Sequence, residues 1–398
     1  MKTLLTSCLI FFISIFGYCQ QKNILFIGNS YTYGNDLPLL VKNLAIANGK
    51  DVFVDSYAVG GATFANHSTS PAVMNKIKSK SWDYVIIQGQ SQEPAFPDQQ
   101  VNNSSIPGAK RLADSVYANN FCTEVMFFMT WGRKNGDPQW GPISTYAGMQ
   151  QRLYDGYMRI ADSCQASVSP VGQVWKSLRT SMPTIELYQS DESHPTLAGS
   201  YLAAMTIYSS VFLELPATLV GNTGLSSQFT TQVSDHIQAD VLDELELYHL
   251  RSADNHTALE DFTISQYSDI VQGVAQTRKA QSVHWDFGDG ASTTGWNVQH
   301  QYSQLGNYTI TVTAQSVCNN DQSTQGVNIE VLAIDEVKVI PFRIENGMVS
   351  IDEDKSSRLL SSSGQTIAHS QYTYDLNMLP KGIYLLWIDG VTFRIPAF

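Results

Sequence analysis

One serine near the start of the chain, and an aspartate and a histidine far from it, could together perform nucleophilic chemistry. Ser30 follows an apolar run in "ILFIGNSYTYG", and Asp191 and His194 stand three apart in "SDESHPTLAGSY". At that spacing the carboxylate can turn back onto the imidazole and hold its tautomer, which leaves the other ring nitrogen free for a hydroxyl. Turn formation and helix initiation are the structural alternatives for the two segments. Their combination favours a nucleophile, a base and an orienting acid.

Two further strand ends carry groups that could stabilise the oxyanion of an acyl-transfer intermediate. Gly60 and Gly61 in "AVGGATF" allow a close backbone approach, and Gln90 in "IIQGQSQEP" offers a side-chain amide. Such donors must be preorganised around the developing charge. A glycine pair alone usually marks a turn, so this prediction depends on three successive strands that end in Ser, Gly-Gly and Gln-Gly-Gln.

The elements that must position these residues alternate between apolar runs and helical segments from residue 20 to about 250. The runs predicted to be strands are "NILFI", "DVFVDSYAV", "DYVIIQ", "EVMFFMTW" and "ASVSPVG". Continuous apolar runs separated by amphipathic helices indicate a parallel sheet that is covered on both faces. We therefore predict an α/β fold with a flavodoxin-like, doubly wound, five-stranded parallel sheet, in which ligands gather at the carboxyl ends of the strands.

The end of the fourth predicted strand, "MTWGRKNGD", adds candidates for a substrate pocket. Trp131 could stack on a sugar ring there and Arg133 could bind a carboxylate or a carbonyl, while core packing is the structural alternative for Trp131. Gln92, after the third strand, is a further candidate. No CxxC motif or His/Cys cluster predicts a metal site, and the proposed chemistry needs no cofactor.

The segments "GNS", "GG", "GQ" and "DESHP", in this order, resemble the four sequence blocks of the SGNH/GDSL hydrolases over about residues 22–215. The resemblance implies the SGNH hydrolase fold for a domain over residues 20–250. It implies a serine esterase in which Ser30 is the nucleophile, His194 is the base and Asp191 orients the base. It also implies an oxyanion hole made by the N–H groups of Ser30 and Gly61 and by the Gln90 amide.

Two positions depart from that family pattern. Asn29 replaces the aspartate of the Gly-Asp-Ser signature, a residue that does not belong to the triad. Gln90 stands where the family has asparagine and carries the same amide on a longer arm. The run Gln-Gly-Gln-Ser resembles a branch of exported bacterial SGNH proteins of poorly defined activity, so the substrate stays open.

The first residues of the chain predict export. Lys2 precedes an apolar run, and Gly17 and Cys19 are small residues before the cleavage point of a signal peptide over residues 1–19. A lipoprotein cut is the alternative, but Tyr18 is a poor residue before a lipidated cysteine. The run is shorter than the roughly 20 residues that span a bilayer, which disfavours an uncleaved anchor. We expect a protein that is secreted or held at the surface of a Gram-negative bacterium, without a stable membrane span.

Composition and cysteine content narrow the class of protein. The 398 residues are 43% hydrophobic and 15% charged, which predicts globular domains, and the net charge of -12 argues against nucleic acid as a partner. Three cysteines remain after cleavage: Cys122, Cys164 and Cys318. Cys122 and Cys164 each precede a strand-like run, and the starts of those strands could lie within bridging distance if the strands are parallel neighbours. The sequence leaves open whether a disulfide joins these two residues.

The chain beyond about residue 256 predicts small all-β sandwich modules. "SVHWDFGDG" and "GNYTITVTA" alternate with period two, and residues 256–332 resemble a PKD-type β-sandwich. Asp286 and Asp289 are expected to stabilise turns there, with calcium binding as the alternative. Residues 336–398, with "LPKGIYLLWIDG", resemble the C-terminal sorting domain of type IX secretion without its usual basic last residue. That resemblance implies the type IX secretion machinery as a partner.

Together these observations predict a secreted serine esterase of SGNH type that forms an acyl-enzyme on Ser30. Export with a spacer module favours O-acetyl or similar acyl groups on a polysaccharide as the substrate, which is an argument by analogy. A lipid esterase or thioesterase is the alternative within the class. A non-catalytic carbohydrate-binding surface protein is the alternative from another class, and adaptation of the site by Asn29 and Gln90 to another hydrolysis is a third.

Overall fold

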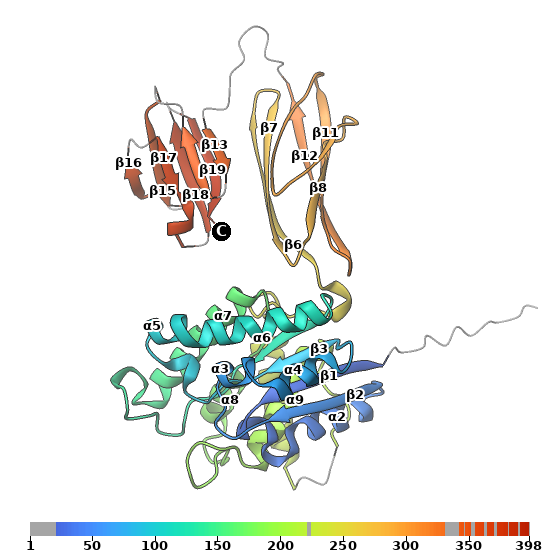
Figure 1. Ribbon diagram of the computed structural model, residues 1–398, viewed down its shortest axis with the longest axis vertical. Coiled ribbons are helices and arrows are strands. Elements are labelled where there is room, and N and C mark those ends of the chain that lie inside the picture. Colours follow the sequence, from blue (N-terminus) through green and yellow to red (C-terminus); the bar gives the residue numbers. More distant parts are fainter. Residues whose placement is uncertain are drawn as a thin grey trace, which may run out of the picture. The chain divides into compact units, whose positions relative to one another are not determined.

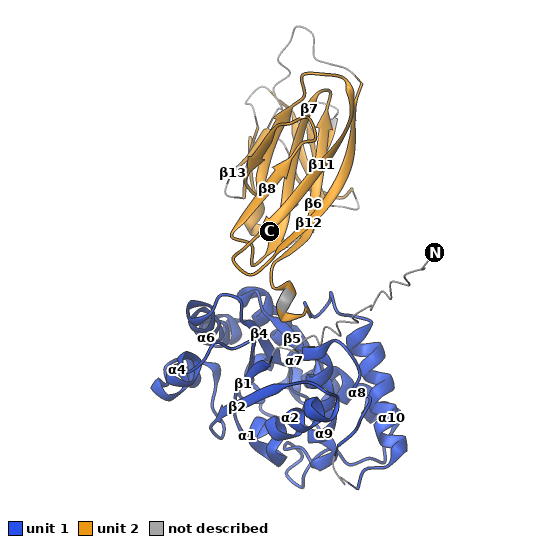
Figure 2. Ribbon diagram, turned by 90° about the vertical axis from the view of Figure 1, so that its right-hand side faces the viewer, with its two compact units in different colours: residues 1–250 blue, residues 251–398 orange. Residues whose placement is uncertain are grey.

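The computed structural model describes nine segments of the chain: residues 21–220, 224–330, 342–345, 347–351, 355–361, 364–369, 372–380, 382–388 and 391–397. The chain divides into two compact units between Leu250 and Arg251, which Figure 2 shows in different colours. The predicted signal peptide lies outside the described residues.

One parallel sheet forms the centre of the first unit. Its strands are β1 (Lys22–Gly28), β2 (Val52–Ala58), β3 (Tyr84–Ile87), β4 (Glu124–Phe128) and β5 (Ser167–Ser169). Their order is β2-β1-β3-β4-β5, and every neighbouring pair is parallel. This is the order of a flavodoxin-like sheet. The predicted fold class is therefore confirmed.

Helices cover both faces of this sheet, which explains why its central strands are continuously apolar. The helices are α1 (Ser30–Tyr33), α2 (Leu37–Ala47), α3 (Phe64–Ser68), α4 (Pro71–Lys78), α5 (Asp98–Gln100), α6 (Ile106–Asn119), α7 (Tyr146–Cys164), α8 (Val171–Ser181), α9 (Leu197–Phe212) and α10 (Ser227–Ile237). Figure 1 shows α6 and α7 on one side of the sheet and α2 and α9 on the other. Residues 24–27 and 84–87 are at most 1% exposed as a result.

The helix α9 is largely apolar because it packs against several other elements. It contacts α2, α8, α10 and β5, and residues 199–211 are all buried. Its first turn is capped by Thr196, whose hydroxyl accepts the N–H of Gly199 at 3.3 Å. The helix therefore begins three residues after His194 and fixes where the loop that carries this histidine ends.

The second unit contains the predicted β modules. The first module has the sheets β10-β7-β6 and β12-β11-β8-β9, built from β6 (Ala258–Tyr267), β7 (Ile270–Arg278), β8 (Ser282–Asp286), β9 (Ser292–Thr294), β10 (Asn297–Gln301), β11 (Gly306–Gln315) and β12 (Asn320–Ile329). Trp285 lies fully buried in its core. Asp286 and Asp289 each accept a backbone N–H two residues on, at 2.9 Å, and so stabilise the turn after β8.

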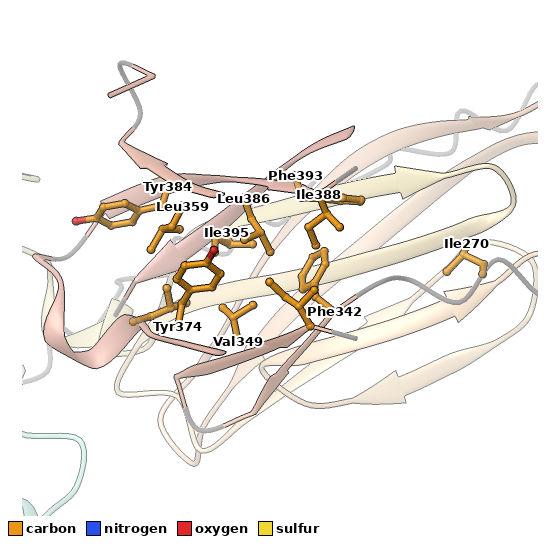
Figure 3. Packing of buried hydrophobic residues seen from close by; sticks show 12 residues of the cluster. Ile270, Phe342, Val349, Leu359, Tyr374, Tyr384, Leu386, Ile388, Phe393 and Ile395 are labelled. Atoms are coloured by element: carbon orange, nitrogen blue, oxygen red, sulfur yellow. The ribbon is translucent and has the colours of Figure 1, made fainter. Parts of the chain in front are cut away.

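The last module is a pair of small antiparallel sheets. Their orders are β13-β14-β17 and β16-β15-β18-β19, with the strands β13 (Phe342–Glu345), β14 (Met348–Ile351), β15 (Ser357–Ser361), β16 (Thr366–His369), β17 (Thr373–Asp375), β18 (Gly382–Ile388) and β19 (Val391–Ala397). Figure 3 shows Phe342, Val349, Leu386 and Ile395 turned toward one another in its core.

The structure answers the question, open from the sequence, of whether a disulfide joins Cys122 and Cys164: it does not. Cys164 is a free, buried thiol, whereas Cys122 and Cys318 are each disulfide-bonded. The strands β4 and β5 are neighbours, as expected. However, Cys164 is the last residue of α7 and its side chain packs into the core, where burial raises the pKa of its thiol to about 12.

Within the described segments, no helix combines the length and apolarity needed to cross a bilayer.

Candidate active site

Ser30 occupies the junction between the first strand and the first helix. β1 ends at Gly28, and Ser30 is the first residue of α1. Gly28 allows this tight turn, because a Cβ atom there would lie 2.1 Å from Oγ1 of Thr32. Asn29 caps the helix, since its side-chain oxygen accepts the N–H of Tyr31 at 3.1 Å. The turn therefore presents the Ser30 hydroxyl at the carboxyl end of the sheet.

A line of hydrogen bonds joins the three predicted triad residues. Nε2 of His194 lies 2.8 Å from Oγ of Ser30, and Nδ1 of His194 is hydrogen-bonded to Oδ2 of Asp191. The other carboxylate oxygen accepts the backbone N–H groups of Ser193 at 3.1 Å and His194 at 3.0 Å. The structure thus brings together side chains that are 164 positions apart in the chain, in the arrangement of a serine nucleophile with its base.

The carboxylate of Asp191 is held in its charged form. Partial desolvation raises its pKa, but the hydrogen bonds from the His194 ring and from two backbone N–H groups lower it more, so the pKa of Asp191 lies below its usual range. An ionised carboxylate at Nδ1 keeps the proton of a neutral imidazole on that nitrogen. Nε2 is then free to accept the proton of the Ser30 hydroxyl.

Tyr31 and Trp131 anchor the loop that carries Asp191 and His194. The Tyr31 hydroxyl lies 2.6 Å from Oγ of Ser193, and Nε1 of Trp131 donates to the carbonyl of Ser193 at 3.1 Å. The ring of Tyr31 stacks on Trp131 with centroids 4.7 Å apart, and its edge contacts the His194 ring. The residue next to Ser30 therefore holds the segment that carries His194.

The prediction that Trp131 offers a stacking surface to a sugar is wrong. Its ring is 0% exposed, because Tyr31 covers one face and Trp175 stacks on it with centroids 4.0 Å apart. The structural alternative, core packing, describes its position. Trp131 contributes to the site through the loop that it holds.

The loop after β4 adds a second anchor for the same segment. The N–H of Lys134 donates to the carbonyl of Glu192 at 2.9 Å, and Nδ2 of Asn135 donates to its carboxylate at 2.9 Å. Glu192 has a left-handed backbone with a φ of 61°. A non-glycine residue holds this conformation only where its surroundings determine it, so the chain from Asp191 to His194 has a defined shape.

Replacing Tyr31 by phenylalanine tests this anchoring. The aromatic stack is retained, but Ser193 loses its partner, and a net hydrogen bond of about 1 kcal/mol corresponds to roughly a fivefold lower kcat with unchanged KM. Steady-state kinetics on a small acetate ester measures the effect. Tyr33→Phe is the matched control, because Tyr33 lies on the same helix with 52% of its surface exposed. Equal losses of kcat in the two variants would contradict the anchoring role.

Asn29 ties the first three strand ends together. Its Nδ2 donates to the carbonyls of Ala62 at 3.3 Å and Gly89 at 3.0 Å. An aspartate here would carry no donor toward these two carbonyls, which gives a physical reason for the departure from the Gly-Asp-Ser signature. Gln88 was not predicted to take part, yet its Oε1 accepts the N–H of Asn29 and the hydroxyl of Thr32, both at 2.9 Å. The only sequence signal was an amide residue at the end of an apolar run.

Gly61 and Gln90 lie just after the second and third strands, in the loops whose Ala62 and Gly89 carbonyls accept hydrogen bonds from Asn29. Gly61 has a left-handed φ of 69°, which favours glycine. The Gln90 side chain is held by Gln92: its oxygen accepts the Gln92 N–H at 2.8 Å, and its amide donates to Oε1 of Gln92 at 3.0 Å. The second amide hydrogen of Gln90 has only a long contact of 3.5 Å to Ser91.

Arg133 and Gln92 meet at a buried carboxylate. The Arg133 guanidinium and the Gln92 amide both donate to Oδ2 of Asp137, whose side chain is 1% exposed. The Arg133 side chain is 30% exposed, so it lies partly at the surface. The two predicted pocket residues thus form one polar cluster at the ends of β3 and β4.

Among the described residues, no group of His, Cys, Asp and Glu side chains could hold a metal ion.

The comparisons with known proteins match this architecture in parts. Residues 263–331 match the family model of the PKD domain. No curated protein matches the chain. A protein from Slackia heliotrinireducens described as an SGNH hydrolase is 23% identical, with a TM-score of 0.38, covering 48% of this chain and 98% of that protein.

Two other solved structures are similar to the first unit. A DUF4886 family protein from Bacteroides uniformis is 16% identical, with a TM-score of 0.48, covering 58% of this chain and 97% of that protein. An acetyl xylan esterase from Geobacillus stearothermophilus is 15% identical, with a TM-score of 0.35, covering 47% and 92%. The chain is thus similar to SGNH hydrolases and esterases at low identity, and it carries a PKD domain.

Proposed function

We propose that the chain is a secreted serine esterase of SGNH type. The observation that carries the proposal is the line of hydrogen bonds from Asp191 through His194 to Oγ of Ser30. His194 takes the Ser30 proton while Oγ forms a bond to the ester carbonyl carbon, and the imidazolium then returns that proton to the departing alcohol. Water, deprotonated by the same imidazole, hydrolyses the acyl-enzyme and releases the acid.

The N–H groups of Ser30 and Gly61 and the amide of Gln90 supply the oxyanion hole in this proposal. The left-handed backbone of Gly61 and the locked Gln90 side chain support it, because preorganised donors need no rearrangement when charge develops on the carbonyl oxygen. The chemistry uses no metal or organic cofactor.

The proposed substrate is an O-acetylated polysaccharide. The side chains of His194 and Asp191 are 37% and 46% exposed, so the triad is open to a bulky polymer. The partly exposed Arg133 side chain offers a polar group that binds hydroxyl and carbonyl oxygens rather than an acyl chain. These features support a carbohydrate esterase over a lipid esterase or thioesterase.

Acetate release tests the proposal. The native protein and Ser30→Ala are incubated with p-nitrophenyl acetate and with a panel of acetylated and feruloylated polysaccharides, and the released acid is quantified. Release from acetylated polymers by the native protein alone supports the proposal. Binding of a polysaccharide without turnover would favour the non-catalytic, carbohydrate-binding alternative, and preferential cleavage of long-chain esters would favour the lipid esterase.

Export to the cell surface or medium, with the type IX machinery recognising the C-terminal module, is part of the same proposal. The disulfide-bonded Cys122 and Cys318 support an oxidising compartment. Mass spectrometry of the mature protein from the medium and from the cell surface tests export. Detection of the full-length chain, with both of its ends retained, in the cytosolic fraction would contradict export.

A further inference from the structure

Glu93 is a buried carboxylate that the proposed mechanism does not use. It begins the 3₁₀ helix η2 (Glu93–Ala95) and is 5% exposed. Its Oε2 accepts the N–H of Phe64 at 3.0 Å and the N–H of Gln90 at 3.3 Å. Burial raises its pKa, and within the described part of the chain no ion pair compensates it. The burial of such an acid is compensated by the hydrogen bonds that it accepts from N–H groups.

These two N–H groups belong to the two loops that would form the oxyanion hole. Phe64 is the first residue of α3 and lies three positions after Gly61. Gln90 is itself the residue whose side-chain amide would bind the oxyanion. Glu93 therefore joins the backbone of the second strand end to the backbone of the third.

The close approach depends on a glycine. A Cβ atom at Gly89 would lie 2.9 Å from Oε2 of Glu93 and 2.6 Å from the ring of Phe64. Only a residue without a side chain lets the carboxylate and the first turn of α3 meet at this point. The chain is thus built to place this acid between the two loops.

Asn29 forms the complementary connection between the same loops. It donates to the carbonyls of Ala62 and Gly89, whereas Glu93 accepts from the N–H groups of Phe64 and Gln90. Each loop is thus held through a donated and an accepted bond.

We propose that Glu93 is a positioning residue of the oxyanion hole, which fixes the backbone of residues 61–64 relative to Gln90. The inference rests on the proposed hydrolase function and adds to it. Glu93 itself touches no substrate. Its removal leaves the nucleophile and base in place and lets the oxyanion donors move, so it weakens transition-state stabilisation rather than substrate binding.

Two substitutions test the inference in the full-length protein. Glu93→Leu keeps the volume but removes both accepted bonds, and we expect kcat on p-nitrophenyl acetate to fall by about 10- to 100-fold with KM changed less than about twofold. Glu93→Gln keeps one accepting oxygen but replaces the other by an amide donor, and we expect a loss of about three- to fivefold. Glu246→Gln, an exposed acid on the same unit, is the control and should match the native protein.

Hydrogen–deuterium exchange measures the bonds themselves. Peptides covering residues 61–66 and 89–92 should exchange faster in Glu93→Leu, whereas peptides covering residues 188–196 should be unchanged. This readout does not depend on turnover, so it separates the positioning role from the proposed hydrolysis: an inactive native protein defeats the hydrolase proposal, while unaltered exchange in these peptides defeats this one.

The kinetic outcomes are also decisive. A folded Glu93→Leu protein with native kcat overturns the inference, and so does a loss that appears in KM alone. If Glu93→Leu does not fold, as judged by its thermal unfolding, Glu93→Gln decides: a lower kcat with unchanged KM supports the positioning role, and native kinetics and exchange overturn it.

Discussion

Replacing Ser30 by alanine is expected to lower kcat for ester hydrolysis by about a millionfold, the loss known for removal of a serine nucleophile from a complete triad. The change removes the atom that lies 2.8 Å from Nε2 of His194. It leaves α1 intact, because alanine is a good helix former and the cap comes from Asn29. Acid release above the buffer background measures the effect.

The control for this prediction is Ser144→Ala, a change at an exposed serine whose hydroxyl bonds only its own turn. It should keep native kcat. A Ser30→Ala protein that remains within tenfold of the native rate would show that no acyl-enzyme forms on Ser30. The remaining activity of the expected variant, supported by the oxyanion hole alone, should be at most about 10³- to 10⁴-fold above the uncatalysed reaction.

Asp191→Asn is expected to lower kcat by roughly 10³- to 10⁴-fold with little effect on KM. Oδ1 of Asp191 accepts two backbone N–H groups, from Ser193 and His194. An asparagine must keep its oxygen at that position, because its NH₂ group cannot face two donors. The amide nitrogen then points at Nδ1 of His194 and forces the proton onto Nε2, where the imidazole can no longer accept the Ser30 proton.

Burst kinetics checks the expected loss of kcat. The pH dependence of stability checks the ionised state of Asp191, on which this second prediction depends. Because the pKa of Asp191 is lowered in the folded protein, its ionisation stabilises the fold at pH values above the unfolded pKa of about 3.9, and this contribution is lost as the pH falls through the folded pKa. The difference in thermal stability between native protein and variant should therefore shrink in acid. Glu192→Gln, next to the triad acid, is the control; equal kcat losses in both variants would show that charge alone, and not the tautomer of His194, matters.

The architecture of the first unit could be predicted because it follows from burial. The runs around Phe26, Ile86 and Phe127 are apolar throughout, and strands buried on both faces require that pattern. The order of the sheet and the meeting of Ser30 with the segment from Asp191 to His194 follow from the rule that loops at the carboxyl ends of parallel strands lie together.

The support around the site could not be predicted, because it depends on loop conformation and not on periodicity. Gln88 and Glu93 act through side-chain bonds to backbone groups of other loops, and a sequence pattern does not specify such bonds. Trp131 was placed at the correct strand end, but only the packing of Trp175 against it shows that the ring is covered. The sequence could not decide whether Cys164 forms a disulfide for a similar reason: the burial of its side chain at the end of α7 is not specified by the pattern of apolar residues.

The stacked indoles of Trp131 and Trp175 give the molecule an intrinsic spectroscopic signal for the state of its site. Parallel rings with centroids 4.0 Å apart and an interplanar angle of 7° couple their electronic transitions. Opening of the segment that carries His194 breaks the bond from Trp131 to Ser193 and disturbs this coupling. We therefore expect near-ultraviolet circular dichroism to change when the segment that carries His194 opens, without a substrate and without a label.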